Sequence, residues 1–253
     1  MAAQSSRVLG LFTSHGSSSD VYDVFEDFGD VTINFEIETS QGSVSDSNVW
    51  AAMASIDLAL NFVGNMSTAT RSTFQSIVEN EASAIFERQS LYISDTQRFL
   101  LPSSHADWSR YRDIEMDDNK ASDCTSGSDE ADDLRDDWSS PTDLLDIWIV
   151  ESFSGPACAA NIGGFSPVDG PTSKGGRRSG LVIQLAGINL STTAGRNLMG
   201  IVVAHEVGHF LGLSHSPTND NFMEASVSTA NTDITHGQYR DMTDHGFVKR
   251  FVP

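Results

Sequence analysis

The chain has 253 residues, 39% of them hydrophobic, which is enough for one sizeable buried core or two small ones. Asp and Glu number 35 against 15 Lys and Arg, and the resulting formal charge of −20 argues against nucleic acid or an anionic membrane as a partner. No apolar run approaches the roughly 18 residues of a membrane span, so we expect a globular monomer without one.

The N-terminal region changes character near residue 30. Residues 1–30 are rich in Ser and Asp and have little periodicity, so we expect a loosely ordered lead-in. A single folded domain is then expected over 31–253. It begins with a half-buried strand, because apolar and polar residues alternate at its start. The apolar positions of this strand are Val31, Ile33, Phe35 and Ile37.

Two segments with apolar residues at helical spacing follow. The first covers 49–62, with Met53, Ile56 and Leu60 on one face. The second covers 74–86, where large apolar residues repeat in a similar way. We expect both segments to form helices that pack on a sheet.

An acidic segment lies in the middle of the chain. Between 113 and 137, 11 of 25 residues are Asp or Glu, and this charge predicts an acidic surface insertion, about 103–138, outside the core. Calcium (Ca2+) binding is an alternative, because carboxylate oxygens are ligands of this ion, but the D-x-D-x-D-G spacing of a calcium loop is absent. A solvated loop is therefore favoured.

Cys124 and Cys158 are either a disulfide pair or two unrelated thiols.

Two short apolar runs in the second half of the chain predict buried strands. They are LLDIWIV over 144–150 and GLVIQL over 180–185. The segment 154–180 between them is rich in Gly, Pro and Ser, so we expect a loop with a short edge strand near 162–165. Strands that alternate with helices predict a mixed α/β domain, α/β or α+β in class, with a mostly parallel sheet.

A further helix is expected from about 194 to 211, with Thr192 or Thr193 as its N-cap. Its end carries the sequence HEVGHFLGLSH. Positions i and i+4 of a helix lie on one face, so His205 and His209 can present two imidazole nitrogens to one ion. This spacing predicts half of a tetrahedral metal site.

Gly212 stands where this helix must end, because glycine tolerates the left-handed conformation of a C-terminal cap. The turn returns His215 toward the same ion. Three nitrogen ligands that leave a fourth position for water are typical of a catalytic zinc site. Glu206 can take a proton from that water without binding the metal. We therefore expect one catalytic Zn2+ held by His205, His209 and His215, with Glu206 as the catalytic base.

The pattern H-E-x-x-H-x-x-G-x-x-H resembles the signature of the metzincin zinc metallopeptidases, and HEVGHFLGLSHS is most similar to the matrixin branch. The resemblance implies a zincin fold: a twisted, mostly parallel sheet with an antiparallel edge strand, an active-site helix, a Met-turn and a C-terminal helix over 237–248. It also assigns Met223, eight residues after His215, to the Met-turn as an apolar floor beneath the histidines. An ordinary core methionine is the alternative.

Metzincins hydrolyse peptide bonds, so the resemblance implies a secreted zinc endopeptidase that uses a zinc-bound water activated by Glu206. Its protein or peptide substrate would lie antiparallel to the edge strand near 162–165. Matrixins usually follow the methionine with Tyr-Pro, whereas Glu224 and Ala225 stand here, so the resemblance leaves the shape of the specificity pocket open. The alternatives are a zinc-stabilised binding or adhesion module without proteolytic activity and a zinc hydrolase of other bonds.

Overall fold

The computed structural model describes residues 7–8, 23–27, 30–39, 42–51, 53–115, 129–155 and 162–251. The chain forms two compact units, one of residues 1–53 with 250–253 and one of residues 54–249. The division lies at residue 53 and not at residue 30, where the composition changes.

The first unit contains a four-stranded antiparallel sheet in the order β1-β2-β3-β4. Its strands are β1 (Arg7–Val8), β2 (Asp23–Asp27), β3 (Asp30–Thr39) and β4 (Gly42–Ala51). The strand predicted over 31–37 is confirmed within β3. Strands β1 and β2 lie within 1–30, where no element was expected.

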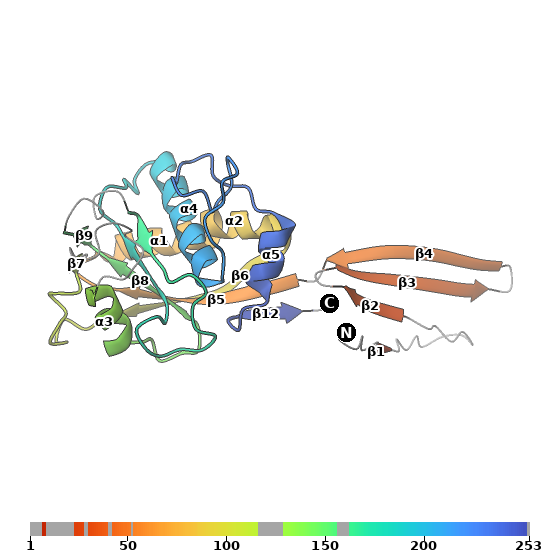
Figure 1. Cartoon of the computed structure of the whole chain (residues 1–253), viewed down its shortest axis with the longest axis horizontal. Coiled ribbons are helices and arrows are strands. Elements are labelled where there is room, and N and C mark those ends of the chain that lie inside the picture. Colours follow the sequence, from red (N-terminus) through yellow and green to blue (C-terminus); the bar gives the residue numbers. More distant parts are fainter. Residues whose placement is uncertain are drawn as a thin grey trace. The chain divides into compact units, whose positions relative to one another are not determined.

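The second unit is built on a six-stranded sheet in the order β10-β11-β8-β5-β12, with β6 paired to β5 (Figure 1). The strands are β5 (Met53–Phe62), β6 (Leu91–Leu100), β8 (Leu145–Val150), β10 (Gly164–Phe165), β11 (Leu181–Gln184) and β12 (Val248–Phe251). Strands β6, β5, β8 and β11 are parallel, and β10 is antiparallel to β11. The predicted α/β class, with a mostly parallel sheet and an antiparallel edge strand, is confirmed.

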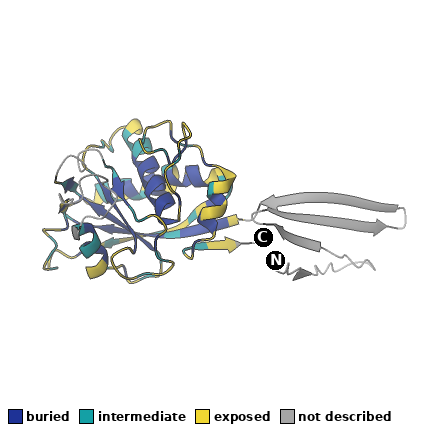
Figure 2. Cartoon of the chain, in the orientation of Figure 1, coloured by how far each residue is buried: buried dark blue, intermediate teal, exposed yellow. Residues whose placement is uncertain are grey.

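The helix predicted over 49–62 is wrong, because this segment forms the end of β4 and the whole of β5. Strand β5 is paired to β6 and β8 and is covered on both faces, as the dark blue of the central strands shows in Figure 2. Ile56, Leu58 and Leu60 are fully buried on one face, and Ala59 is fully buried on the other. The polar residues Ser55, Asp57 and Asn61 alternate with the apolar ones, which is the pattern of a strand, but the spacing of Met53, Ile56 and Leu60 also fits a helix.

The core has two layers, one on each face of this sheet. Ile147 and Ile149 of β8 belong to a cluster with helices α1 (Thr68–Ile77), α2 (Ser83–Phe86) and α4 (Thr193–Phe210), whereas Trp148 and Val150 belong to a second cluster. A π-helical segment, Val78–Ala82, joins α1 to α2 without a break in the helix. The helix predicted over 74–86 is therefore confirmed. Among the described residues, no helix is long and apolar enough to cross a membrane.

The acidic segment contributes to the second layer, contrary to our expectation of an insertion outside the core. Strand β7 (Asp113–Glu115) pairs with β9 (Ser152–Ser154), and helix α3 (Asp129–Asp137) buries Ala131 and Leu134 completely. Arginines from elsewhere in the chain balance its carboxylates: Arg110 binds Glu130 and Asp133 at 2.7 Å each. Cys124 and Cys158 lie outside the described residues.

The C-terminal helix α5 (His236–Thr243) is shorter than the predicted 237–248, because the chain turns after Thr243 and enters β12. Gly246 lies in this turn. A Cβ at Gly246 would lie 2.7 Å from the Cβ of Thr172, so the turn packs too closely for a larger residue.

Candidate metal centre

Helix α4 carries the candidate site and matches its predicted range to within one residue. Thr192 is its N-cap, and its side chain accepts a hydrogen bond from Gly195 N at 3.0 Å. The apolar face of the helix is fully buried and anchors it in the core. This face consists of Met199, Val203, Val207 and Phe210.

The structure brings the three predicted histidines together. The ring centroids of His205 and His209 are 4.6 Å apart, and that of His215 lies 5.2 Å and 4.7 Å from them. One nitrogen from each ring lies within 4.8 Å of the others, and no other group of three possible metal-ligating side chains exists among the described residues. The described part of the acidic segment therefore gives no support to a calcium site.

The turn after α4 delivers His215. Gly212 has a φ of +104°, and its N–H donates to His209 O at 3.0 Å. The N–H of Leu213 donates to Gly208 O at 2.9 Å. These two bonds form a Schellman cap, which ends the helix and reverses the chain. The role predicted for Gly212 rests on this left-handed conformation.

Backbone carbonyls fix the orientation of both helical histidines. The Nδ1 of His205 lies 2.8 Å from Phe222 O, and the Nδ1 of His209 lies 2.7 Å from Leu213 O. A carbonyl only accepts hydrogen bonds, so each Nδ1 carries the proton and each Nε2 keeps its lone pair for a metal. The Nε2 atoms of His209 and His215 lie 3.1 Å apart. Two nitrogens bound tetrahedrally to one zinc ion are separated by about 3.4 Å, so the histidines fit this metal.

Burial sets the charge state of the site. It lowers the pKa of His205 to about 4, with a further contribution from the neighbouring His209, and it also lowers the pKa of His209. Both rings are therefore neutral near pH 7, as metal ligands must be. Burial raises the pKa of Glu206 to about 8. This carboxyl group lies next to the first ligand on the wall of the same cleft.

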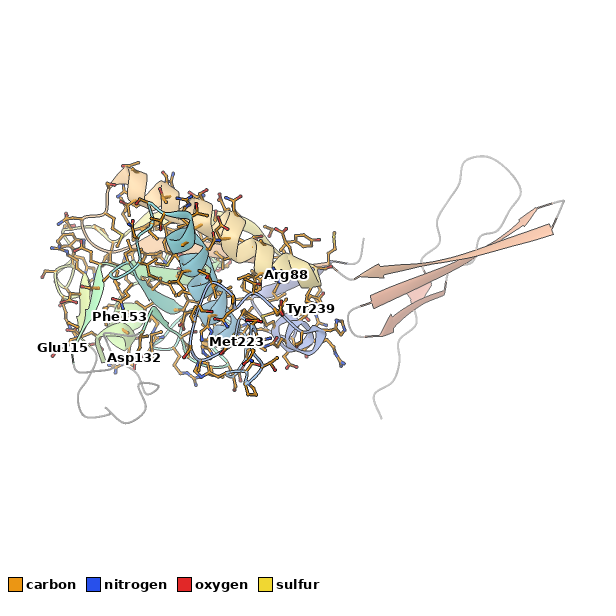
Figure 3. All side chains as sticks on the ribbon, turned by 90° about the horizontal axis from the view of Figure 1, so that it is seen from above. Arg88, Glu115, Asp132, Phe153, Met223 and Tyr239 are labelled. Atoms are coloured by element: carbon orange, nitrogen blue, oxygen red, sulfur yellow. The ribbon has the colours of Figure 1, made fainter. Side chains whose placement is uncertain are left out.

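Met223 packs against the metal-binding part of α4, and Figure 3 shows it close to one end of that helix. Its N–H donates to the Oδ1 of Asn221 at 3.0 Å, and its carbonyl accepts from Ser216 N at 2.8 Å. The amides of Asn221 and Gln238 bond to each other twice, at 3.0 Å and 2.9 Å. Sequence reasoning missed both residues, although Gln238 stands three positions after Thr235, the spacing of a capping box.

A cleft of about 830 Å³ runs past the three histidines. Its walls are the edge strand β10 with its neighbours, helix α4 and the segment 225–227. Gly164 packs directly on Glu206, because a Cβ there would lie 2.5 Å from the Cγ of Glu206. Gln184 N donates to Gly163 O, and Gly164 is paired with Ile183. By the alternation of an antiparallel pair, the N–H and C=O of Gly164 point away from β11, toward an edge at which no described strand pairs with β10.

Two histidines one turn apart on a buried helix, a third returned by the following turn and a carboxyl group beside the first form a centre of metallopeptidase type. The sequence profile described as matrixin, peptidase family M10, matches residues 18–244, and the chain belongs to this family. No curated protein sequence matches the chain significantly.

The chain is similar to several solved structures. One is archaemetzincin from Methanopyrus kandleri, with 14% identity, a TM-score of 0.46, and coverage of 75% of this chain and 94% of the other. Another is metalloproteinase-II from Bacteroides fragilis, with 11% identity, a TM-score of 0.45, and coverage of 89% and 79%.

Proposed function

We propose that the chain is a zinc-dependent endopeptidase in which His205, His209 and His215 hold the metal and Glu206 is the catalytic base. The observation that carries this proposal is the convergence of three imidazoles, two of them oriented by backbone carbonyls, and one buried carboxyl group on a single open cleft. Family membership supports peptidase chemistry. Met223 is proposed as the apolar floor of the site.

Zinc bound by the three imidazoles would polarise the scissile carbonyl and lower the pKa of a water molecule beside it. Glu206 would take the proton of that water as it attacks and pass the proton to the leaving amine. Burial strengthens this carboxylate as a base, because it disfavours the charged form. A divalent cation nearby would favour the charged carboxylate and lower the pKa of Glu206, so that the group could be ionised and accept a proton near neutral pH.

The free edge of β10 supports binding of an extended peptide. Gly164 offers an N–H and a C=O at this edge, and an added antiparallel strand would use them. The cleft wall follows α4 from Leu198 to His209, with His205 and Glu206 between these ends. A peptide chain could therefore extend on both sides of the bond that is cleaved, as an endopeptidase requires.

The walls of the cleft favour apolar substrate side chains. Ile188, Leu198, Val202 and Val227 line it. Ala225, which stands where matrixins usually have proline, also lines the cleft, so a small residue replaces a larger ring in the wall. We infer a preference for an uncharged, apolar residue beside the scissile bond.

The decisive experiment is Glu206→Gln, which keeps the size of the side chain and removes the base. We expect about one zinc per chain and a loss of casein hydrolysis by several orders of magnitude. Asp241→Asn, which also replaces a carboxylate by an amide but at an exposed residue, should leave casein hydrolysis unchanged. A zinc chelator should abolish hydrolysis by the parent and by Asp241→Asn. Equal turnover by Glu206→Gln and the parent would reject this role. A zinc-loaded parent that cleaves nothing would instead favour the binding module.

A further inference from the structure

Within the described residues, one buried histidine lies outside the metal centre. His245 follows α5, and its side chain packs against Phe210 and Phe247, with ring centroids 5.2 Å and 5.9 Å away. Its Nδ1 accepts a hydrogen bond from Phe247 N at 3.3 Å, so the proton of the neutral ring is on Nε2. That Nε2 donates to Gly170 O at 3.0 Å. One tautomer thus satisfies both bonds.

The partner of His245 belongs to a wall of the cleft. Segment 166–170 continues from the edge strand β10, and Ser166 and Val168 line the cleft. Its far end is bonded to the last turn of α4: Asp169 N donates to His209 O at 3.0 Å, and Gly170 N donates to Phe210 O at 2.8 Å. Both carbonyls belong to the last turn of the helix, and that of His209 also accepts from Gly212 N at 3.0 Å. The wall and a candidate metal ligand are therefore joined.

Gly170 lies between His245 and α4. A Cβ at Gly170 would lie 2.4 Å from the ring of Phe210, so the backbone rests directly on that ring. Asp169 holds a φ of +55°, which a non-glycine residue rarely adopts without support. The bond from His245 to Gly170 O adds to the two bonds between this segment and α4. Exposed Arg178 also donates to Val168 O and Asp169 O, but exposed bonds of this kind contribute little.

We propose that His245 is a positioning residue, which fixes segment 166–170 and thereby the cleft wall beside His209. The inference rests on the proposed function, since it assigns this wall to substrate binding. An apolar side chain at 245 would leave Gly170 O and Phe247 N without their buried partner, and the wall would loosen. The effect falls on substrate binding, because His245 touches neither the cleft nor the three candidate ligands.

The test compares His245→Phe, which keeps a ring of similar size without polar atoms, with His245→Gln, which restores a donor to Gly170 O. The matched control is His236→Phe, the same change at an exposed residue of α5 that does not line the cleft. In His245→Phe we expect the amides of Asp169 and Gly170 to exchange hydrogen about tenfold faster, with those of α1 unchanged. KM of His245→Phe for a peptide substrate should be about tenfold higher than that of the parent, whereas its kcat and zinc content should stay within about threefold of the parent values.

In His245→Gln, the logarithms of the exchange rates and of KM should lie at least halfway back from the values of His245→Phe to those of the parent. His236→Phe should match the parent in both quantities. Unchanged exchange at Asp169 and Gly170 in His245→Phe would overturn the inference, as would equal losses of kcat and zinc, which indicate general damage. If His245→Phe does not fold, His245→Met takes its place. Hydrogen exchange is measured without substrate and does not depend on peptidase activity. If the parent protein cleaved no peptide, the proposed function would be rejected, but the exchange rates would still test whether His245 positions the wall.

Discussion

Gly208 and Met223 are in direct contact, with no room for another atom between them. A Cβ at Gly208 would lie 2.5 Å from the Sδ of Met223 and 2.9 Å from the ring of Phe222. The carbonyl of Phe222 also orients His205. The small residue in the helix therefore lets the turn 221–224 approach closely enough for Phe222 O to bond to His205.

Gly208→Ala should disturb the metal centre without touching a ligand. The added methyl group must displace Met223, at a cost of about 1 to 3 kcal/mol in the free energy of unfolding, and zinc should bind more weakly. Gly237→Ala is the control, because its new Cβ would meet only the Oγ1 of Thr235, at 3.8 Å. Urea unfolding and zinc titration measure the two effects. Equal results for the two variants would show that the contact has no influence on the site.

His215→Ala should separate metal binding from folding. His215 is exposed, so its loss should change the free energy of unfolding of the metal-free protein by less than about 0.5 kcal/mol. The parent should gain on the order of 10 °C in melting temperature from zinc at 1,000 times its dissociation constant, and the variant should gain almost none. Calorimetry with and without a chelator tests this, and a full zinc-dependent gain in the variant would remove His215 from the ligand set.

Much of the candidate site could be predicted because its residues are close in sequence. The spacing of His205, Glu206 and His209 is set by one turn of helix, and Gly212 marks the reversal that returns His215. The bounds of α4 followed from a threonine cap at one end and a glycine at the other. Local signals of this kind determine local geometry without reference to the rest of the fold.

The parts that sequence reasoning missed depend on partners far along the chain. His245 bonds to Gly170, 75 residues away, and the carbonyl that orients His205 comes from Phe222. Helix α3 was expected outside the core because carboxylates dominate its sequence, whereas Arg110 binds two of them and its Ala131 and Leu134 are buried. Strand β5 was taken for a helix because the spacing of Met53, Ile56 and Leu60 fits a helix, although polar and apolar residues alternate over 55–62 as in a strand.

Gly212→Ala tests the turn that delivers His215. Nothing lies within 4 Å of a Cβ at Gly212, so the only cost is the φ of +104°, about 1 to 2 kcal/mol. Gly176→Ala is a matched control with a φ of +81° and equally open space. Both variants should lose similar stability in urea, but only Gly212→Ala should lose zinc affinity. A loss of zinc affinity in both would mean that the turn after α4 has no particular role.

Glu206 should make the stability of the metal-free protein depend on pH. Its pKa is about 8 in the folded chain against an ordinary value of 4.5, so between these values the folded chain binds a proton that the unfolded chain has released. Stability from this group is therefore fully present below about pH 4.5 and is lost as the pH rises to 8. The loss should be on the order of 4 kcal/mol. Glu206→Gln should not show it.

The comparison of Glu206→Gln with the parent isolates this group from the histidines. The lowered pKa values of His205 and His209 reduce stability as the pH falls below 6.5, but they do so in both proteins. Urea unfolding of chelator-treated protein should therefore give nearly equal free energies at pH 5 and a more stable variant at pH 8. Parallel curves across this range would mean that the carboxyl group is hydrated in solution, and its assignment as a buried base would then be wrong.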